Sequence, residues 1–391
     1  MNLPERHIHQ FIDRLTESDI SFAITRIPWT DEPILVLQEE GEPEIMEKLG
    51  DLNGKKGFLL APFNPSEEHP IVLIRPDQVV HDWEEICPLL QNFRQKHPEL
   101  APDVSERPPL QEITVAHTPD KANAGHIIIA TDTEEDRTAY MEAFGRFITP
   151  LKEKTFQKLV LCRKAEHILP DGFSPLETFI RACNSYPRML ISLCHTPKTG
   201  TWLGSTPEII LSGNETLWHT VALAGTMPMQ GEVMPTEWSK KNQEEQALVS
   251  EYVRRIVKKF GSKITEKGPY TARAGQLVHL KTDFHFLLKD ADHQGDILQE
   301  LHPTPAVCGL PKQEAYTFIA GNEGIDRSYY SGIIGWIDPQ GDTNLYVNLR
   351  CMNIHDNRAT LYAGGGILTS STPETEWEET RQKMNTMRNI L

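Results

Sequence analysis

The segment LYVNLRCMNIHDNRATLYAGGGILTSSTPETEWEETRQKM, residues 345–384, carries the clearest structural pattern of the chain. Two runs typical of β-strands, 345–349 and 360–363, precede a glycine triplet and a charged helix. Upstream of it, strand-like runs at 158–162, 189–194 and 208–212 mix with helices. They lack the regular βαβα alternation of a doubly wound parallel sheet. We therefore expect one large α+β fold with extensive, mostly antiparallel sheets and helices on the outside.

The N-terminal part of the chain is less diagnostic. MNLPERHIHQFIDRL looks like the start of an amphipathic helix, and short strands are expected at 58–61 and 71–74. A helix is expected at 83–93. The segment 97–123 is rich in proline and charge and is interpreted as a long surface connection. It is either a domain boundary or a loop across one large fold.

A helix start is signalled at Thr133, which is followed by three acidic residues. Threonine caps a helix N-terminus, and acidic side chains in the first turn favour the helix dipole. Tyr140, Phe144 and Phe147 provide an apolar stripe on the same face. The helix is expected to stop near Pro150.

Composition and charge restrict the classes of function. The chain has 391 residues and a formal net charge of −16, with no basic stripe that could neutralise phosphates, so nucleic acid is not expected as a partner. No stretch reaches the roughly 18 consecutive apolar residues of a spanning helix, and the N-terminus lacks a signal-peptide layout, so we expect a cytoplasmic protein without a membrane partner. The scattered cysteines predict buried, reduced thiols rather than disulfides or zinc.

Lys158 and Glu208 are candidates for acid–base chemistry. Lys158 begins an apolar strand run, where a lysine is usually a solvated end. In an apolar pocket, however, a lysine can lose its proton and serve as a base. Glu208 stands between a Ser-Thr-Pro turn and Ile-Ile-Leu. It is either a strand-edge residue facing water or a carboxyl that keeps its proton and acts as a general acid.

Two further segments suggest binding. The small residues Ala224-Gly225-Thr226 would let the backbone approach a ligand. In the helix that follows, Lys241 and Glu245 are four residues apart, which ordinarily indicates a solvated salt bridge.

The C-terminal motifs complete the set. Two prolines and Gly309 make 301–312 a stiff loop. The glycine run from Gly364 can present backbone N–H groups to an anion. Glu376, Glu379 and Lys383 share one helix face, which would ordinarily be charged and wet.

In order, these motifs read strand-Lys, STPE, ALAGT, KKNQEE, HPTPAVCG, LRC, AGGGI and EWEETRQK. As a set they resemble the chorismate-utilising enzymes, which include isochorismate synthases, salicylate synthases and the large subunits of anthranilate and aminodeoxychorismate synthases. The resemblance begins near Thr133. We therefore divide the chain into residues 1–125, the N-terminal part of the fold, and residues 126–391, a chorismate-binding catalytic region.

Two positions select the branch of the family. The resemblance assigns Lys158 as the base that activates water, whereas the amine-transferring members use ammonia from a glutaminase and commonly carry threonine at the position of Ala306. The loop wording HPTPAVCG resembles the isochorismate branch rather than the salicylate synthases. The resemblance thus implies a reversible, Mg2+-dependent isomerisation of chorismate to isochorismate, without a glutaminase partner. We expect a monomer.

The resemblance also implies a role for each motif residue. Lys158 is the base and Glu208 the acid that protonates the departing C4 hydroxyl. Glu245 and Glu379 hold Mg2+. The substrate-binding residues that it implies are Gly225, Thr226, His279, Ala306, Arg350, Gly364 and Lys383.

Alternatives within and outside the branch remain. The amine-transferring branch (anthranilate or aminodeoxychorismate synthase component I), salicylate synthase and a non-catalytic chorismate-binding relative are the competing interpretations. Three positions depart from the common family pattern: Met227, Gln246 and Lys281. Whether the product serves menaquinone or siderophore synthesis is open at this stage, with menaquinone preferred.

Overall fold

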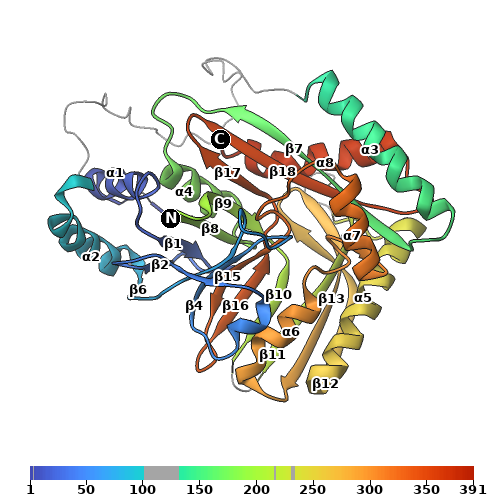
Figure 1. Ribbon diagram of the computed structural model, residues 1–391, viewed down its shortest axis with the longest axis horizontal. Helices are drawn as coiled ribbons and strands as arrows, with labels where there is room; N and C mark the ends of the chain where they lie inside the picture. The colour runs from blue at the N-terminus through green and yellow to red at the C-terminus, as the bar shows by residue number, and fades with distance from the viewer. Residues whose placement is uncertain (3, 101–131, 215–216, 230–233) are drawn as a thin grey trace.

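The structure, a computed structural model, describes residues 1–391 except 3, 101–131, 215–216 and 230–233. In the described part, two nine-stranded sheets pack against each other, and all of their strand pairs are antiparallel (Figure 1). The α+β expectation with mostly antiparallel sheets is confirmed. The connection predicted at 97–123 lies outside the described residues from position 101 onward.

The first sheet runs in the order β14 (Gly309–Leu310), β7 (Lys158–Ile168), β18 (Arg358–Ile367), β17 (Cys351–His355), β9 (Gly200–Thr206), β8 (Leu190–Thr196), β1 (Phe22–Arg26), β2 (Pro33–Leu37) and β6 (Gln78–His81). The second sheet runs in the order β12 (Gly261–Ala274), β13 (Leu277–Leu288), β11 (Trp218–Pro228), β10 (Ile209–Gly213), β16 (Thr343–Val347), β15 (Ile333–Ile337), β4 (Gly57–Ala61), β5 (Ile71–Ile74) and β3 (Glu44–Met46). Strands from the N-terminal hundred residues therefore complete both sheets.

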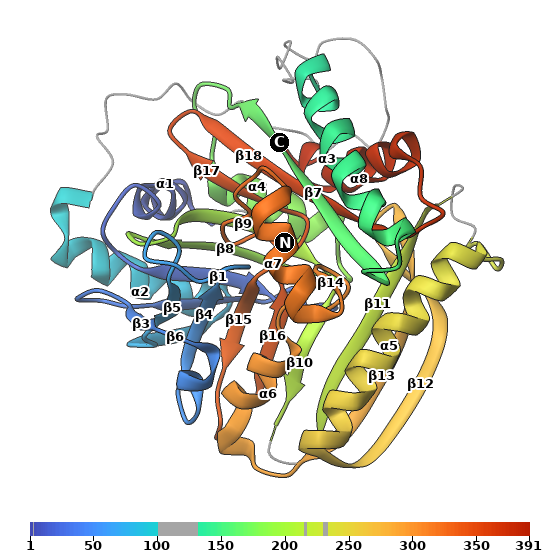
Figure 2. The same cartoon turned by 45° about the vertical axis from the view of Figure 1, so that its right-hand side comes forward.

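Helices cover the outer faces of the two sheets (Figure 2). The first sheet packs against α1 (Arg6–Leu15), α2 (Asp82–Lys96), α4 (Pro175–Ser185) and α8 (Pro373–Arg388). The second packs against α5 (Lys240–Phe260) and α6 (Gln294–Leu301). The helices α3 (Glu134–Lys152) and α7 (Lys312–Asn322) lie beside β7. No helix among the described residues is long and apolar enough to cross a membrane.

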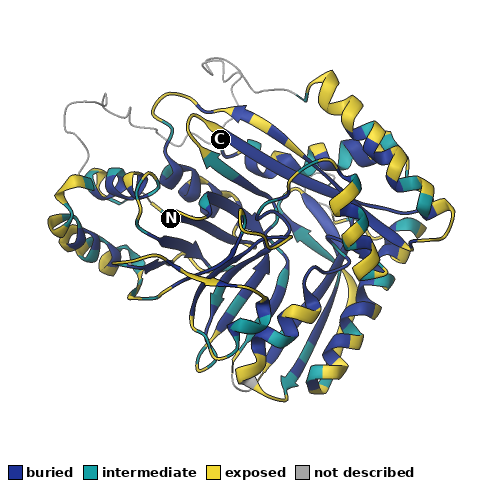
Figure 3. Cartoon of the chain, viewed as in Figure 1, coloured by how far each residue is buried: buried dark blue, intermediate teal, exposed yellow. Residues whose placement is uncertain are grey.

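Both faces of the central strands are buried, as Figure 3 shows for the strands at the centre of the molecule. In β1, Phe22 and Ile24 point toward the helices, whereas Ala23 points into the layer between the sheets. In β4, Phe58 points into the same layer, whereas Leu59 faces the helices of the second sheet. Side chains alternate along a strand, so a strand enclosed on both sides is apolar at nearly every position. The short apolar runs of the sequence are explained by this arrangement.

The predicted start of α3 is confirmed. Thr133 Oγ1 accepts a hydrogen bond from the backbone N–H of Asp136, and the Asp136 carboxylate accepts one from the Thr133 N–H. The predicted stripe of Tyr140, Phe144 and Phe147 is buried. The helix ends at Lys152, two residues after Pro150.

The cysteines are also as expected. All six are free, and five of them are buried.

Candidate active site

A cavity of about 50 Å3 opens where β7 and β18 of the first sheet approach β11 and β13 of the second. Side chains from segments that are distant in the sequence converge on it. Its lining consists of Val160, Glu208, Leu223, Ala224, Gly225, Thr226, Glu245, His279, Ala306, Val307, Tyr330, Leu349, Arg350, Gly364, Gly366 and Lys383. The structure thus brings together all seven residues predicted to bind substrate, together with Glu208 and Glu245. The other two predicted residues, Lys158 and Glu379, lie directly behind this lining.

Lys158 is fully buried, so the alternative of a solvated strand end is wrong. It lies two residues before Val160 on β7, and the two side chains therefore share a face of the strand. Lys158 Nζ is 2.9 Å from Glu245 Oε1. Burial raises the pKa of Glu245, but Lys158 and Lys241 more than offset this, so the pKa lies below its ordinary value. Glu245 is therefore a carboxylate held against a buried ammonium group.

The close approach of these two side chains requires a glycine in β18. A Cβ on Gly366 would lie 2.1 Å from Glu245 Oε1 and 3.0 Å from Lys158 Cε. The first distance is far below any van der Waals contact, so another residue at this position would displace the carboxylate. The glycine run therefore serves to make space for two charged side chains.

Glu208 is 3% exposed, so the alternative of a strand-edge residue facing water is also wrong. Its carbonyl oxygen accepts a hydrogen bond from the backbone N–H of Val347, which fixes it to β16. Burial raises the pKa of Glu208 to about 7, although the positive charges of Lys158 and Arg350 oppose the shift. A carboxylic acid of this kind holds its proton near neutral pH, as a general acid must.

Arg350 and His279 form a fixed pair on the cavity wall. Arg350 Nη2 donates to His279 Nε2 at 3.1 Å, so the other ring nitrogen, Nδ1, carries the proton and donates to the carbonyl oxygen of Gly225 at 3.0 Å. Burial, reinforced by the charge of Arg350, holds the pKa of His279 well below its ordinary range. The ring is therefore neutral.

Arg350 itself has two unusual properties. Its φ is 46°, a left-handed conformation that costs free energy for a residue with a side chain. Its Nη1 atom is buried and has no hydrogen-bond partner among the described residues. A buried guanidinium group with free N–H donors at a cavity wall is suited to an anionic ligand.

The helix α8 contributes two glutamates and a lysine. Lys383 Nζ donates to Glu379 Oε1 at 2.8 Å and to the carbonyl oxygen of Gly364 at 2.7 Å. Gly364 was expected to offer a backbone N–H group to an anion; in this structure its carbonyl binds the lysine.

The ordinary explanation of two motifs in this region is wrong. A charged helix face such as that of α8 would ordinarily be wet, yet Glu376 is 2% exposed. Lys241 and Glu245 would ordinarily form a solvated salt bridge with each other. Instead Lys241 Nζ lies 2.6 Å from Glu376 Oε1, and Glu245 pairs with Lys158.

The sequence interpretation missed Glu376 and Lys241 as parts of the site. The signal was present, since Glu376 shares the helix face of Glu379, and Lys241 precedes Glu245 by one turn. Periodicity shows that residues share a face but not what covers that face. Here β18 and α5 cover it, and Lys241, the partner of Glu376, lies 135 residues earlier in the sequence.

The arrangement of carboxylates fits a hard divalent cation. The position that a Gly365 Cβ would occupy lies 3.2 Å from Glu376 Oε2 and 3.5 Å from Glu379 Oε1. Glu376 Oε2 is buried without a hydrogen-bond partner among the described residues. Burial and repulsion by Glu379 raise the pKa of Glu376. Both carboxylates thus face Gly365, and one or two carboxylates completed by water are typical magnesium ligands.

No group of three or more acidic, histidine or cysteine side chains already meets in metal-binding geometry within the described ranges. The lysines instead hold the glutamates apart as separate ion pairs, Lys158 with Glu245, Lys241 with Glu376 and Lys383 with Glu379.

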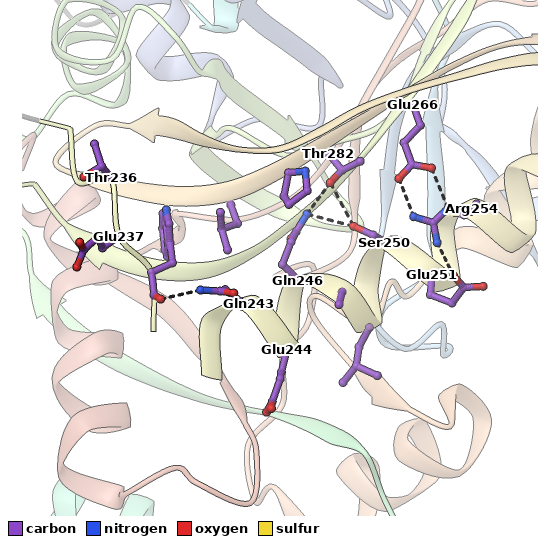
Figure 4. A pocket seen from close by; sticks show the side chains of 15 residues that line it. Thr236, Glu237, Gln243, Glu244, Gln246, Ser250, Glu251, Arg254, Glu266 and Thr282 are labelled. Carbon is purple, nitrogen blue, oxygen red and sulfur yellow. Dashed lines mark hydrogen bonds and ion pairs between the residues drawn. The ribbon is translucent and has the colours of Figure 1, made fainter. Parts of the chain in front are cut away.

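A larger groove of about 1230 Å3 lies on another side of α5, between this helix, β12, β13 and the segment 236–238 (Figure 4). Gln246, one of the residues that depart from the family pattern, lines it. Gln246 Nε2 donates to the carbonyl oxygen of Ala222 at 3.0 Å and lies 3.1 Å from Thr282 Oγ1. This residue therefore ties α5 to β11 and β13 beside the site, while the groove itself contains none of the predicted site residues.

Comparison with known proteins agrees with this geometry. The family model described as chorismate binding enzyme matches residues 77–391. The isochorismate synthase EntC of Escherichia coli strain K12 is 33% identical over 200 residues, which cover 49% of this chain and 51% of EntC. The isochorismate synthase DhbC of Bacillus subtilis is 28% identical over 287 residues, which cover 69% of this chain and 72% of DhbC. The chain spans about half the length of EntC.

Solved structures share the fold over nearly the whole chain. A putative 2,3-dihydroxybenzoate-specific isochorismate synthase, DhbC, from Bacillus anthracis has a TM-score of 0.75 at 22% identity, covering 97% of this chain and 98% of its own. The menaquinone-specific isochorismate synthase MenF from Escherichia coli has a TM-score of 0.72 at 21% identity, covering 100% and 92%. Because the family model spans most of the sequence and the motif residues line one cavity, the chain belongs to the chorismate-binding enzyme family.

Proposed function

We propose that this protein is an isochorismate synthase, which moves a hydroxyl group from C4 to C2 of the chorismate ring. The observation that carries the proposal is that a buried lysine and a buried, protonatable glutamate lie beside one cavity, Lys158 and Glu208. Relatives named isochorismate synthases support it. The reaction is an isomerisation because the water added at C2 replaces the one lost from C4.

Lys158 is the proposed base for the attacking water. It lies behind the cavity lining, where its Cε is 3.0 Å from the position of a Cβ on Gly366. In the structure it is an ammonium group paired with Glu245, so it must lose a proton before it can act as a base, and loss of the pairing with the carboxylate would favour the neutral amine. As water adds to C2, its proton passes to the Lys158 amine and the ring double bonds shift toward C4.

Glu208 is the proposed acid for the departing hydroxyl. With a pKa of about 7 it is substantially protonated near neutral pH. Its proton passes to the C4 oxygen as the C–O bond breaks, and water leaves. In the reverse direction the two residues exchange roles, which agrees with a reversible reaction.

Arg350 is the proposed ligand of a substrate carboxylate. Its Nη1 donors are free within the described part of the chain, and His279 fixes the opposite edge of the guanidinium group. Lys383, which now binds Glu379 and Gly364, is the second cation at the cavity. Together they would supply the positive charge that a dianion requires inside an acidic protein.

Glu245 and Glu379 are the proposed protein ligands of Mg2+, with Glu376 adjacent to them. When bound, the cation would neutralise the ring carboxylate and assist departure of the hydroxyl. The unpartnered Glu376 oxygen and the crowding of the carboxylates around Gly365 support this assignment.

The test is a chromatographic assay of chorismate with Mg2+, with and without ammonia. We expect isochorismate in both reactions and no release of pyruvate. An aminated product formed only with ammonia would identify the amine-transferring branch, and pyruvate with salicylate would identify a salicylate synthase. No conversion at all would favour a non-catalytic relative. Anthranilate synthase component I from Streptococcus pneumoniae shares the fold at a TM-score of 0.62, so the fold does not distinguish these branches.

The pathway served by the product stays a prediction, and we propose menaquinone synthesis. Similar proteins carry names from both pathways, among them the vibriobactin-specific enzyme of Vibrio cholerae and MenF of Bacillus subtilis. A deletion strain distinguishes the two: it should lack menaquinone and keep any catecholate siderophore.

A further inference from the structure

Three lysines pair with the glutamates at the proposed metal site, which are the two proposed ligands Glu245 and Glu379 and the adjacent Glu376. The distances between nitrogen and oxygen are 2.9 Å for Lys158–Glu245, 2.6 Å for Lys241–Glu376 and 2.8 Å for Lys383–Glu379. All of these side chains are largely buried. A divalent cation that enters must therefore compete with ammonium groups that already satisfy the carboxylates.

Lys241 differs from the other two lysines because it has no place in the proposed chemistry. Lys383 lines the cavity, whereas Lys158 and Lys241 are not among the lining residues. Lys158 is the proposed base, and its Cε lies 3.0 Å from the position of a Cβ on the lining residue Gly366. The Lys241 side chain extends from the first turn of α5 to α8, where it contacts Glu376. Its charge interacts most strongly with Glu376 and also with Glu379 and Glu245.

The ion pair between Lys241 and Glu376 determines which carboxylate oxygens are left for a cation. Glu376 Oε1 is occupied by Lys241, while Oε2 points toward Gly365 without a partner among the described residues. Glu379 Oε1 lies near the same glycine. In the absence of a cation, the lysine thus offsets the repulsion between the neighbouring carboxylates of Glu376 and Glu379. It also occupies one of them, Glu376.

We propose that Lys241 is an internal competitor for the metal, which occupies Glu376 and thereby weakens binding of a divalent cation at Glu245, Glu376 and Glu379. This inference deepens the proposed function, since it rests on the magnesium assignment made there. It predicts that the site binds metal more weakly than its three carboxylates alone would.

The experiment measures Mn2+ binding to the metal-free protein by electron paramagnetic resonance, at one pH and without chorismate. Lys241→Gln should tighten binding by about tenfold, because one positive charge is removed from a largely buried site. Lys241→Met removes the same charge but keeps the apolar stem, and it serves if the glutamine variant does not fold. Unchanged or weaker binding in the folded variant overturns the proposal.

The matched control is Lys240→Gln. Lys240 is the preceding residue of α5, but its side chain is 91% exposed, and its ion pair within the described residues is with Glu244 at 3.6 Å. The same change of charge there should leave Mn2+ affinity within about twofold, because solvent screens it. An equal gain in both variants would show a general charge effect and overturn the role of Lys241.

A double variant tests whether Glu376 mediates the effect. When Lys241→Gln is added to Glu376→Gln, it should tighten Mn2+ binding much less than it does in the wild-type background. An equal gain in both backgrounds would contradict the competition for Glu376. The measurement does not depend on catalysis, so tighter Mn2+ binding in the Lys241 variant would support this inference even if the protein makes no isochorismate. Failure of both wild type and variants to bind Mn2+ would overturn this inference and the magnesium assignment together.

Discussion

Lys158 and Glu208 are buried together although burial of an unpaired charge is costly. The protein meets this cost differently for each residue. Lys158 has a carboxylate partner, Glu245, whereas burial raises the pKa of Glu208 to about 7, so its neutral form predominates below that pH. One motif residue is therefore held in an ion pair and the other is a weak acid that titrates near neutral pH.

Replacement of the proposed base should abolish turnover. We expect Lys158→Met to lower kcat by at least about a thousandfold, the scale of a lost general base. Mn2+ binding should persist, because Glu245 remains and loses a competing cation. Lys164→Met is the control on the same strand, since Lys164 is exposed, and it should retain activity. Near-normal turnover of the Lys158 variant would remove the base assignment.

The raised pKa of Glu208 predicts a pH-dependent gain in stability when it is replaced. Between pH 4.5 and about 7 the folded protein holds this proton while the unfolded chain has lost it, so the free energy of unfolding falls as pH rises. Glu208→Gln should therefore be more stable than wild type by up to about 3 kcal/mol above pH 7 and should show little gain near pH 4. Urea unfolding at both pH values measures this.

The same variant should be inactive, which would separate stability from catalysis. Glu67→Gln, at an exposed position between β4 and β5, controls for the loss of a carboxylate and should change stability equally little at both pH values. A gain for Glu208→Gln that does not depend on pH would contradict the assigned pKa.

Among the secondary-structure elements, β18 leaves room for the Glu245 side chain of α5 only because it carries a glycine at position 366. Gly366→Ala would place a methyl group 2.1 Å from Glu245 Oε1. We expect kcat/KM to fall by at least about a hundredfold and Mn2+ binding to weaken, because the carboxylate must move. Gly145→Ala is the control: it lies in α3, where an added Cβ meets nothing within 4 Å, and should stabilise the helix slightly. Wild-type activity in the Gly366 variant would show that the carboxylate can relocate freely.

Elements with a local cause could be predicted from the sequence. The start of α3 follows from Thr133 and Asp136, and the strands around 158–162 and 345–349 follow from short apolar runs. The surroundings of α8 could not be predicted in this way. Glu376 and Lys241 are 135 residues apart, and nothing in the periodicity of either helix indicates that they meet. The local sequence around each residue has the charged pattern of a solvent-exposed helix, because that pattern does not show which elements cover the helix in the fold.

At the scale of the molecule, residues 22–81 cannot be separated from the rest of the fold. β1 pairs with β8, and β4 pairs with β15, so N-terminal strands extend both sheets. The order of strands in the sheets was not predictable, because neighbouring strands are often distant in sequence. The candidate site was more predictable than the fold, since the resemblance supplied its residues, but their ion pairs emerged only from the structure.

This arrangement predicts that the fragment 132–391 does not fold alone. This fragment lacks β1 to β6, so β8 and β15 become open sheet edges and the apolar layer between the sheets is uncovered. We expect the fragment to aggregate on expression and to lack a cooperative thermal transition. Co-expression with residues 1–100 should increase the soluble fraction. A soluble fragment with a sharp transition would show that the region is an independent domain.

The strands enclosed on both faces have a consequence for synthesis of the protein. Segments such as PILVL, GFLLA and IVLI are nearly uniformly apolar and have a high β-propensity. PILVL and IVLI pair with strands nearby in the sequence, but GFLLA (β4) also pairs with β15, which is encoded more than a hundred residues later. Such long-range pairing is slow, and exposed apolar strands associate between molecules. The yield of native protein should therefore depend on temperature and on chaperones more than its final stability would suggest.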